Sequence, residues 1–152
     1  MIKYITDKQL KKEICLNILR KLPKWFSLED GILQYAEECK HSYFWADVEN
    51  DEYVAFISLK ETSSYAVEIA VMGVVSEYQN KGIGSKLFKS CYGFAKENGY
   101  EFIQVKTVKK GKYKSYDLTN SFYIKLGFKE LECIDNLWDK NNSCQIYIMS
   151  IQ

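Results

Sequence analysis

The chain has 152 residues, of which 47% are hydrophobic and 27% charged, values typical of one globular domain with a sizeable core. Its 21 basic and 20 acidic residues give a net charge of +1, which argues against nucleic acid or an anionic membrane as partner. Five scattered cysteines without a C-x-x-C pair, and a single histidine, argue against a metal site. The first residues lack an apolar signal region, so we expect a single cytoplasmic domain over residues 1–152 without a membrane span.

The first half of the chain is predicted to hold one strand, two helices and three further strands. The helices would begin at side-chain caps, Thr6 or Asp7 for the first and Ser27 for the second. The expected elements are a strand at 2–5, a helix to about residue 21, a helix to about residue 40, and strands at 43–48, 53–60 and 65–74.

The second half is predicted to hold two helices and three strands. The clearest helix runs from Gly82 to Asn98, with one apolar stripe and a terminating glycine at Gly99. The remaining elements are a strand at 101–108, a basic loop at 109–115, a helix from Asp117 or Thr119 to Gly127, and strands at 128–134 and 145–151 joined by a loop with Trp138. The order is therefore β-α-α-β-β-β-α-β-α-β-β.

The segment QNKGIGS opens the Gly82 helix and has the composition of a phosphate-binding turn. It fits neither the G-x-G-x-x-G dinucleotide pattern, because Leu87 takes the third glycine position, nor a Walker A loop. Its N–H groups at a helix start form an anion-binding arrangement, and the alternative is a capped helix with two chance glycines. The residues concerned are Gln79, Asn80, Lys81, Gly82, Ile83, Gly84 and Ser85.

Two stretches in order resemble the GNAT superfamily of acetyl-CoA-dependent N-acetyltransferases. EIAVMGVVSEYQNKGIGSKLF is similar to that family's strand, pyrophosphate loop and helix, and TNSFYIKLGFKELE is similar to its later tyrosine-bearing helix and strand. The resemblance implies an α/β (α+β) fold: a central mixed, mostly antiparallel sheet of six to seven strands flanked by about four helices.

A narrower resemblance is to a bacterial GNAT subgroup whose natural substrates are mostly unassigned. LPKWFSLEDGILQYAEE, YDLTNSFYIKLGF and LWDKNNSC carry it. The chain departs from that subgroup at Ala70, where a histidine is common, and at Ser143 and Gln145, where proline and leucine are common. These departures bear on the acceptor substrate more than on coenzyme A.

The resemblance assigns acetyl-CoA as co-substrate. The N–H groups from Gln79 to Ser85 would hold its pyrophosphate, and the strand residues Met72 and Val74 would bind the pantetheine arm. The Val74 N–H would donate to the thioester oxygen, where a preorganised donor contributes a few kcal/mol. Asn120 is a candidate contact for the CoA arm, with a plain helix-surface residue as the alternative.

Two residues are candidates for proton transfer. Glu68 lies six residues before Val74 in an apolar strand, so its carboxylate would be partly desolvated and suited to act as a base. The alternatives are a strand glutamate that faces solvent or pairs with a lysine, and deprotonation through water alone. Tyr123 matches the family tyrosine that protonates the leaving CoA thiolate, and the alternative is a core tyrosine.

Other residues carry weaker hypotheses. Trp25 and Phe26 would wall an acceptor pocket or pack in the core, and Tyr113 and Trp138 have the same ambiguity. The basic loop would meet the CoA 3′-phosphate or an acidic acceptor, or be a solvated charged loop. Cys144 lacks a partner for a nucleophilic role, because His41 is the sole histidine.

The predicted activity is acetyl transfer to a primary amine of a small molecule or peptide by direct attack in a ternary complex. A non-catalytic acyl-CoA-binding sensor or partner module is the alternative, although such a module needs neither Glu68 nor Tyr123. The sequence leaves the acceptor open, since one fold serves many acceptors. A homodimer, common among relatives, is an open expectation.

Overall fold

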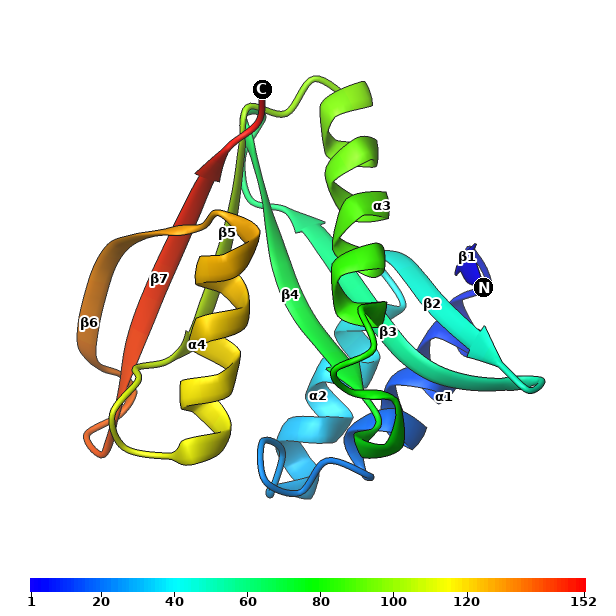
Figure 1. Ribbon diagram of the computed structural model, residues 1–152, viewed down its shortest axis with the longest axis horizontal. Helices are drawn as coiled ribbons and strands as arrows, with labels where there is room; N and C mark the ends of the chain where they lie inside the picture. Colours follow the sequence, from blue (N-terminus) through cyan, green and yellow to red (C-terminus); the bar gives the residue numbers. More distant parts are fainter. The chain divides into compact units, whose positions relative to one another are not determined.

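A computed structural model describes residues 1–152 as seven strands and four α-helices (Figure 1). The elements are β1 Ile2–Tyr4, α1 Lys8–Leu19, α2 Glu29–Cys39, β2 Tyr43–Glu49, β3 Glu52–Glu61, β4 Ala66–Val74, a short 3₁₀ helix Ser76–Tyr78, α3 Ile83–Glu97, β5 Phe102–Val108, α4 Lys114–Leu126, β6 Lys129–Asp139 and β7 Asn142–Ser150. The strands form one sheet in the order β1-β2-β3-β4-β5-β7-β6. The predicted α/β fold, a mixed sheet with four helices, is confirmed.

The chain divides into two compact units. The N-terminal unit comprises Met1–Lys60 and Ile69–Phe94, and the C-terminal unit comprises Glu61–Glu68 and Ala95–Gln152. Strand β4 therefore contributes its first residues to one unit and its last residues to the other. That residues 1–152 act as a single domain stays a prediction.

Two cap predictions in the N-terminal unit have different outcomes. Asp7 caps α1, because its carboxylate accepts from the Leu10 N–H at 2.9 Å. The cap predicted at Ser27 is wrong: α2 begins after Leu28, which makes no side-chain cap bond. The acidic pair Glu29–Asp30 in the first turn of α2 instead complements the helix dipole.

The β2–β3 hairpin is held by a tight turn and a stacked aromatic core pair. Asn50 and Asp51, the two central turn residues, have φ values of 51° and 63°, as a two-residue hairpin turn of the mirror-image type requires. Phe44 and Phe56, both buried, stack with ring centroids 5.2 Å apart. This predicted hairpin is confirmed.

The C-terminal unit differs from the prediction at the start of α4 and in its last hairpin. Helix α4 begins at Lys114, earlier than the predicted start at Asp117 or Thr119, so both residues lie inside it. The Asp117 carboxylate accepts from the Gly111 N–H at 2.7 Å, and the Thr119 hydroxyl donates to the Ser115 carbonyl. Trp138 lies within strand β6, not in a loop, and is 47% exposed.

None of the four α-helices is both long and apolar enough to cross a membrane.

The Asp7 cap generates the first prediction. Asp7→Ala should lower the free energy of unfolding by about 1 kcal/mol, since one N–H at the start of α1 loses its acceptor. Thr6→Ala, at the exposed neighbouring position that also suits a cap, should leave it within about 0.5 kcal/mol. Urea denaturation of both variants measures the difference, and equal losses would contradict the assignment of the cap.

Candidate functional site

The loop after β4 has two left-handed residues directly before helix α3. Asn80 has φ 61° and Gly82 has φ 81°. The Gly82 carbonyl accepts from the Lys86 N–H at 3.1 Å, so the helical hydrogen bonds begin at this glycine. Because the first N–H groups of a helix lack intrahelical partners, this end of α3 presents donors suited to an anion.

Gln79 ties this loop to the end of β4. Its side-chain Nε2 donates to the Val74 carbonyl at 2.8 Å, and its backbone N–H donates to the Ser76 carbonyl at 3.3 Å. The side-chain amide and the backbone N–H of Gln79 are therefore both engaged within the chain, and Gln79 holds the loop in position.

Lys81 supplies positive charge beside the loop. Its exposed side chain lies over the Tyr78 ring, with Nζ 5.3 Å from the centroid. The Tyr78 hydroxyl accepts from Asn50 Nδ2 at 3.3 Å, which connects the loop to the β2–β3 turn. The cation is thus oriented by an aromatic face that is itself anchored.

Trp25 and Phe26 form a half-buried turn between α1 and α2. Both backbone N–H groups donate to the Leu22 carbonyl, at 3.1 Å and 3.0 Å. The Phe26 ring meets the edge of Tyr35 of α2 at a centroid distance of 5.9 Å. Tyr35 extends this aromatic turn, and the sequence analysis missed its contribution.

Glu68 is buried in the C-terminal unit and held by two side chains of β5. Its Oε1 accepts from Gln104 Nε2 at 2.7 Å and lies 3.3 Å from Lys106 Nζ. The alternative of a glutamate paired with a lysine therefore describes its contacts. Gln104 and Lys106 were missed, although their spacing of two places both on one face of a strand.

Distance along β4 also bears on Glu68. Six residues of extended strand separate it from Val74, a span of about 20 Å. A general base must reach the transferred proton directly or through one water. Direct contact between Glu68 and an amine next to Val74 is therefore disfavoured, and the role of Glu68 stays a prediction.

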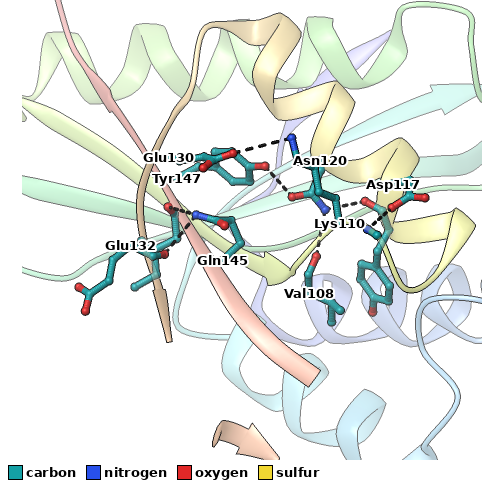
Figure 2. A network of polar contacts seen from close by, with 11 residues as sticks. Val108, Lys110, Asp117, Asn120, Glu130, Glu132, Gln145 and Tyr147 are labelled. Carbon is teal, nitrogen blue, oxygen red and sulfur yellow. Dashed lines mark hydrogen bonds and ion pairs between the residues drawn. The ribbon is translucent and has the colours of Figure 1, made fainter. Parts of the chain in front are cut away.

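Asn120 lies at the centre of a buried polar network (Figure 2). Its Nδ2 donates to the Val108 carbonyl at 2.9 Å and to the Tyr116 carbonyl at 2.6 Å, and its Oδ1 accepts from the Tyr147 hydroxyl at 2.6 Å. Burial raises the pKa of Tyr147 above its usual value, which keeps this donor protonated. Asn120 is thus a buried residue and not a surface one. Its amide could bind a ligand only by giving up these hydrogen bonds.

Tyr123 lies one helical turn after Asn120 and is buried. Its ring contacts Tyr147 at a centroid distance of 6.2 Å and meets the edge of Phe128 at 5.7 Å. Helix α4 ends just beyond, at Gly127, whose φ of 110° is left-handed. Tyr147 therefore contacts both Asn120 and Tyr123, and no motif marked it beforehand.

The basic loop before α4 is fastened to the β6–β7 hairpin. The Lys109 N–H donates to the Ser143 carbonyl at 3.0 Å, Lys112 Nζ donates to the Asn141 carbonyl, and Lys110 lies 3.8 Å from Glu130. The loop is charged and exposed, as a solvated loop would be. The side chains of Lys110 and Lys112 are engaged within the unit, which leaves its role toward the CoA 3′-phosphate or an acidic acceptor a prediction.

Two of the three residues at which the chain departs from the bacterial subgroup make hydrogen bonds within the same hairpin, while the third, Ala70, lies in β4. Ser143 donates to Asp135 at 2.6 Å, and Gln145 Nε2 donates to the Glu132 carbonyl at 3.2 Å, where the strand register shifts. These polar side chains therefore hold the β6–β7 pairing together.

Metal and thiol chemistry find no support in the geometry. No group of three or more His, Cys, Asp or Glu side chains is placed to hold a metal ion. Burial raises the pKa of the Cys144 thiol, which disfavours the nucleophilic thiolate. Of the five thiols, Cys133 alone is exposed, because β6 is the edge strand.

The structure thus gathers the predicted residues into separate groups. In the N-terminal unit, Val74 and Gln79 come together at the loop before α3, and Trp25 and Phe26 form the aromatic turn. In the C-terminal unit, Asn120 and Tyr123 share Tyr147.

Comparison with known proteins identifies the family. The model of the acetyltransferase (GNAT) family matches residues 13–128, most of the chain. The chain therefore belongs to this family of enzymes, as the sequence motifs predict. No curated protein sequence matches the chain, and membership of the bacterial subgroup stays a prediction.

Solved structures show the same fold at low sequence identity. Ard1 from Thermoplasma volcanium has a TM-score of 0.80 at 18% identity, and aminoglycoside 6′-N-acetyltransferase from Enterococcus faecium has 0.78 at 19%; each alignment covers 100% of this chain and 97% of the other. A GNAT family acetyltransferase from Elizabethkingia anophelis with acetyl-CoA bound has 0.69 at 20%, covering 88% of both chains.

The Asn120 network generates the second prediction. Tyr147→Phe should lower the free energy of unfolding by about 1–2 kcal/mol, because Asn120 loses a buried donor. Asn120→Ala should cost more, since it leaves two carbonyls and the Tyr147 hydroxyl without this partner. Chemical denaturation measures both, with Tyr65→Phe, at a 62% exposed position, as the unchanged control. A Tyr147→Phe variant as stable as wild type would contradict the network.

Proposed function

We propose that this protein transfers the acetyl group of acetyl-CoA to a primary amine of a small molecule or peptide by direct attack in a ternary complex. The loop from Gln79 to Ser85 carries the proposal, because it combines left-handed backbone, a helix start and Lys81 in a chain of the GNAT family. The acetyl-CoA bound to the relative from Elizabethkingia anophelis supports the same co-substrate here.

The N-terminal unit would hold the co-substrate. The first N–H groups of α3, at Ile83, Gly84 and Ser85, suit the pyrophosphate, with Lys81 adding charge. Met72 and the N–H of Val74 would bind the pantetheine arm and the thioester oxygen. Gln79, through its bond to the Val74 carbonyl, would keep the end of β4 and the loop in register.

Tyr123 is the proposed acid. Its phenol would share a proton with the sulfur as the carbon–sulfur bond breaks and negative charge develops on the thiolate. The support is its match to the family tyrosine and its fixed position against Tyr147 and Phe128 at the end of α4.

The amine must lose a proton to complete the transfer, and we propose that this proton leaves through water, with Glu68 as its final acceptor. The distance along β4 and the contacts with Gln104 and Lys106 argue for such an indirect role. A purely structural Glu68–Lys106 ion pair, with water as the sole acceptor, is the competing assignment.

The remaining parts of the proposal concern surroundings and partners. Trp25 and Phe26 would wall the acceptor site from the α1–α2 turn. Asn120 would act on the CoA arm through the position of α4. A single cytoplasmic domain and the absence of nucleic-acid or membrane partners remain proposals that composition supports. A homodimer remains a proposal that rests only on its being common among relatives.

The third prediction tests the co-substrate site. Acetyl-CoA should bind the wild-type protein in calorimetry, and Gly82→Ala should weaken that binding about 5- to 30-fold, because a left-handed alanine costs about 1–2 kcal/mol that the free loop can relieve by relaxing and the bound loop cannot. Gly99→Ala is the matched control: its φ is also 81°, and its added Cβ likewise meets nothing within 4 Å. Loss of affinity in both variants, or in neither, would count against a phosphate role for the loop.

The fourth prediction tests the proton transfers by release of free CoA in the presence of a panel of primary amines. Tyr123→Phe should lower kcat by about 10²–10⁴ and abolish the decline in rate at high pH, because that decline reports loss of the acid's proton. Glu68→Gln should lower kcat/KM and alter the limb at low pH, where a base is protonated.

Lys106→Met is the matched variant for Glu68. A purely structural ion pair would make Glu68→Gln and Lys106→Met lose similar stability while both retain kcat/KM. Acetyl-CoA binding without turnover for any amine in the panel would favour the sensor or partner module over the enzyme.

A further inference from the structure

Gly73 marks the closest approach between helix α1 and strand β4. A Cβ added at this buried glycine would lie 3.0 Å from Leu22 Cδ1, 3.1 Å from Ile18 Cγ2 and 3.5 Å from Leu19 Cδ2. The first two distances are tighter than nine in ten real Cβ contacts, so an added methyl group requires Leu22 and Ile18 to give by a few tenths of an ångström, whereas the third is ordinary van der Waals contact. The last turn of α1 therefore packs directly on the backbone of β4.

Leu22, three residues beyond the end of α1, holds the aromatic turn. The Leu22 carbonyl accepts from the backbone N–H groups of both Trp25 and Phe26, while the Leu22 side chain lies on Gly73. A shift of Leu22 would therefore be passed to both aromatic residues. Leu22 alone connects Gly73 to the aromatic turn, because its side chain contacts Gly73 and its carbonyl bonds Trp25 and Phe26.

Gly73 also lies between the two strand residues proposed to bind the acyl-CoA. Strand alternation directs Gly73 toward α1 and its neighbours, Met72 and Val74, toward the opposite face. One side of this short segment would thus contact the co-substrate, while the other side positions the proposed acceptor wall.

We infer that Gly73 is a positioning residue that sets the distance between the thioester-binding segment of β4 and the aromatic acceptor wall at Trp25 and Phe26. The effect of Gly73 on acetyl transfer rests on the proposed function. The contacts from Gly73 through Leu22 to Trp25 do not depend on it. Because misplacement of reacting groups by about 1 Å can cost about 100-fold in rate, a shift of a few tenths of an ångström is enough to be measured.

Gly73→Ala is the primary variant. It adds one methyl group at the contact and should raise KM for the acceptor amine, or lower kcat/KM, about 3- to 10-fold. Acetyl-CoA affinity should stay within about twofold, because the loop before α3 is untouched. Gly93→Ala in α3 is the matched control, since its added Cβ meets nothing within 4 Å and it lies in the same unit.

Fluorine NMR of protein labelled with 5-fluorotryptophan reads the mechanical link without any acceptor. The three tryptophans give three resonances, and Trp25→Phe assigns the relevant one. Gly73→Ala should move the Trp25 resonance, and Gly93→Ala should leave it in place. Leu22→Val removes Cδ1, so the double variant Gly73→Ala/Leu22→Val should return the resonance and the acceptor KM toward wild type.

The outcomes separate the inference from the proposed function. An unmoved Trp25 resonance in a folded Gly73→Ala protein overturns the link. A moved resonance with unchanged acceptor KM and unchanged kcat/KM for n-butylamine, phenethylamine or a lysine peptide overturns the positioning role. If the wild type acetylates none of the amines tested but binds acetyl-CoA, the proposed transfer fails, while the resonance still decides the link. If Gly73→Ala does not fold, Leu22→Val alone, which loosens the contact from the other side, supplies the same two readings.

Discussion

Strand β4 is the constraint on which the rest of the structure depends. Its nine residues are divided between the two compact units, and it carries Glu68 near its start and Gly73 and Val74 at its end. Because an extended strand advances about 3.3 Å per residue, its sequence positions act as fixed distances. That spacing separates a carboxylate near one end of β4 from the thioester-binding segment at the other.

Close backbone packing positions the elements around the end of β4. Gly73 admits α1, and the side chain of Gln79 fastens the following loop to the Val74 carbonyl. The left-handed Gly82 then turns the chain into α3. Each contact uses a small residue or an amide rather than a charge, so this region gains its geometry from sterics and neutral hydrogen bonds. Such contacts are directional and insensitive to salt, which suits the proposed role of this segment in holding a thioester in one orientation.

The C-terminal unit positions Tyr123 by a different means. Buried Asn120 satisfies its polar atoms with the carbonyls of Val108 and Tyr116 and with the Tyr147 hydroxyl (Figure 2). In a medium of low polarity such a network stabilises one arrangement, because any shift leaves several groups unpaired. The orientation of α4, and with it Tyr123, therefore follows from one buried amide.

The sequence by itself determined the order of the elements and most of their bounds, apart from the start of α4 and the β6–β7 hairpin, because hydrophobic periodicity, the cap at Asp7 and the glycines at Gly82, Gly99 and Gly127 are local signals. Its two motifs also indicated the family, since they preserve backbone requirements of the fold. Only the tertiary structure decided which side chains meet. It forms the ion pair between Glu68 and Lys106, the hydrogen bond between Asn120 and Tyr147, and the packing of Leu22 against Gly73. These contacts join residues 27 to 51 positions apart, and their existence depends on packing between elements, which no local pattern encodes.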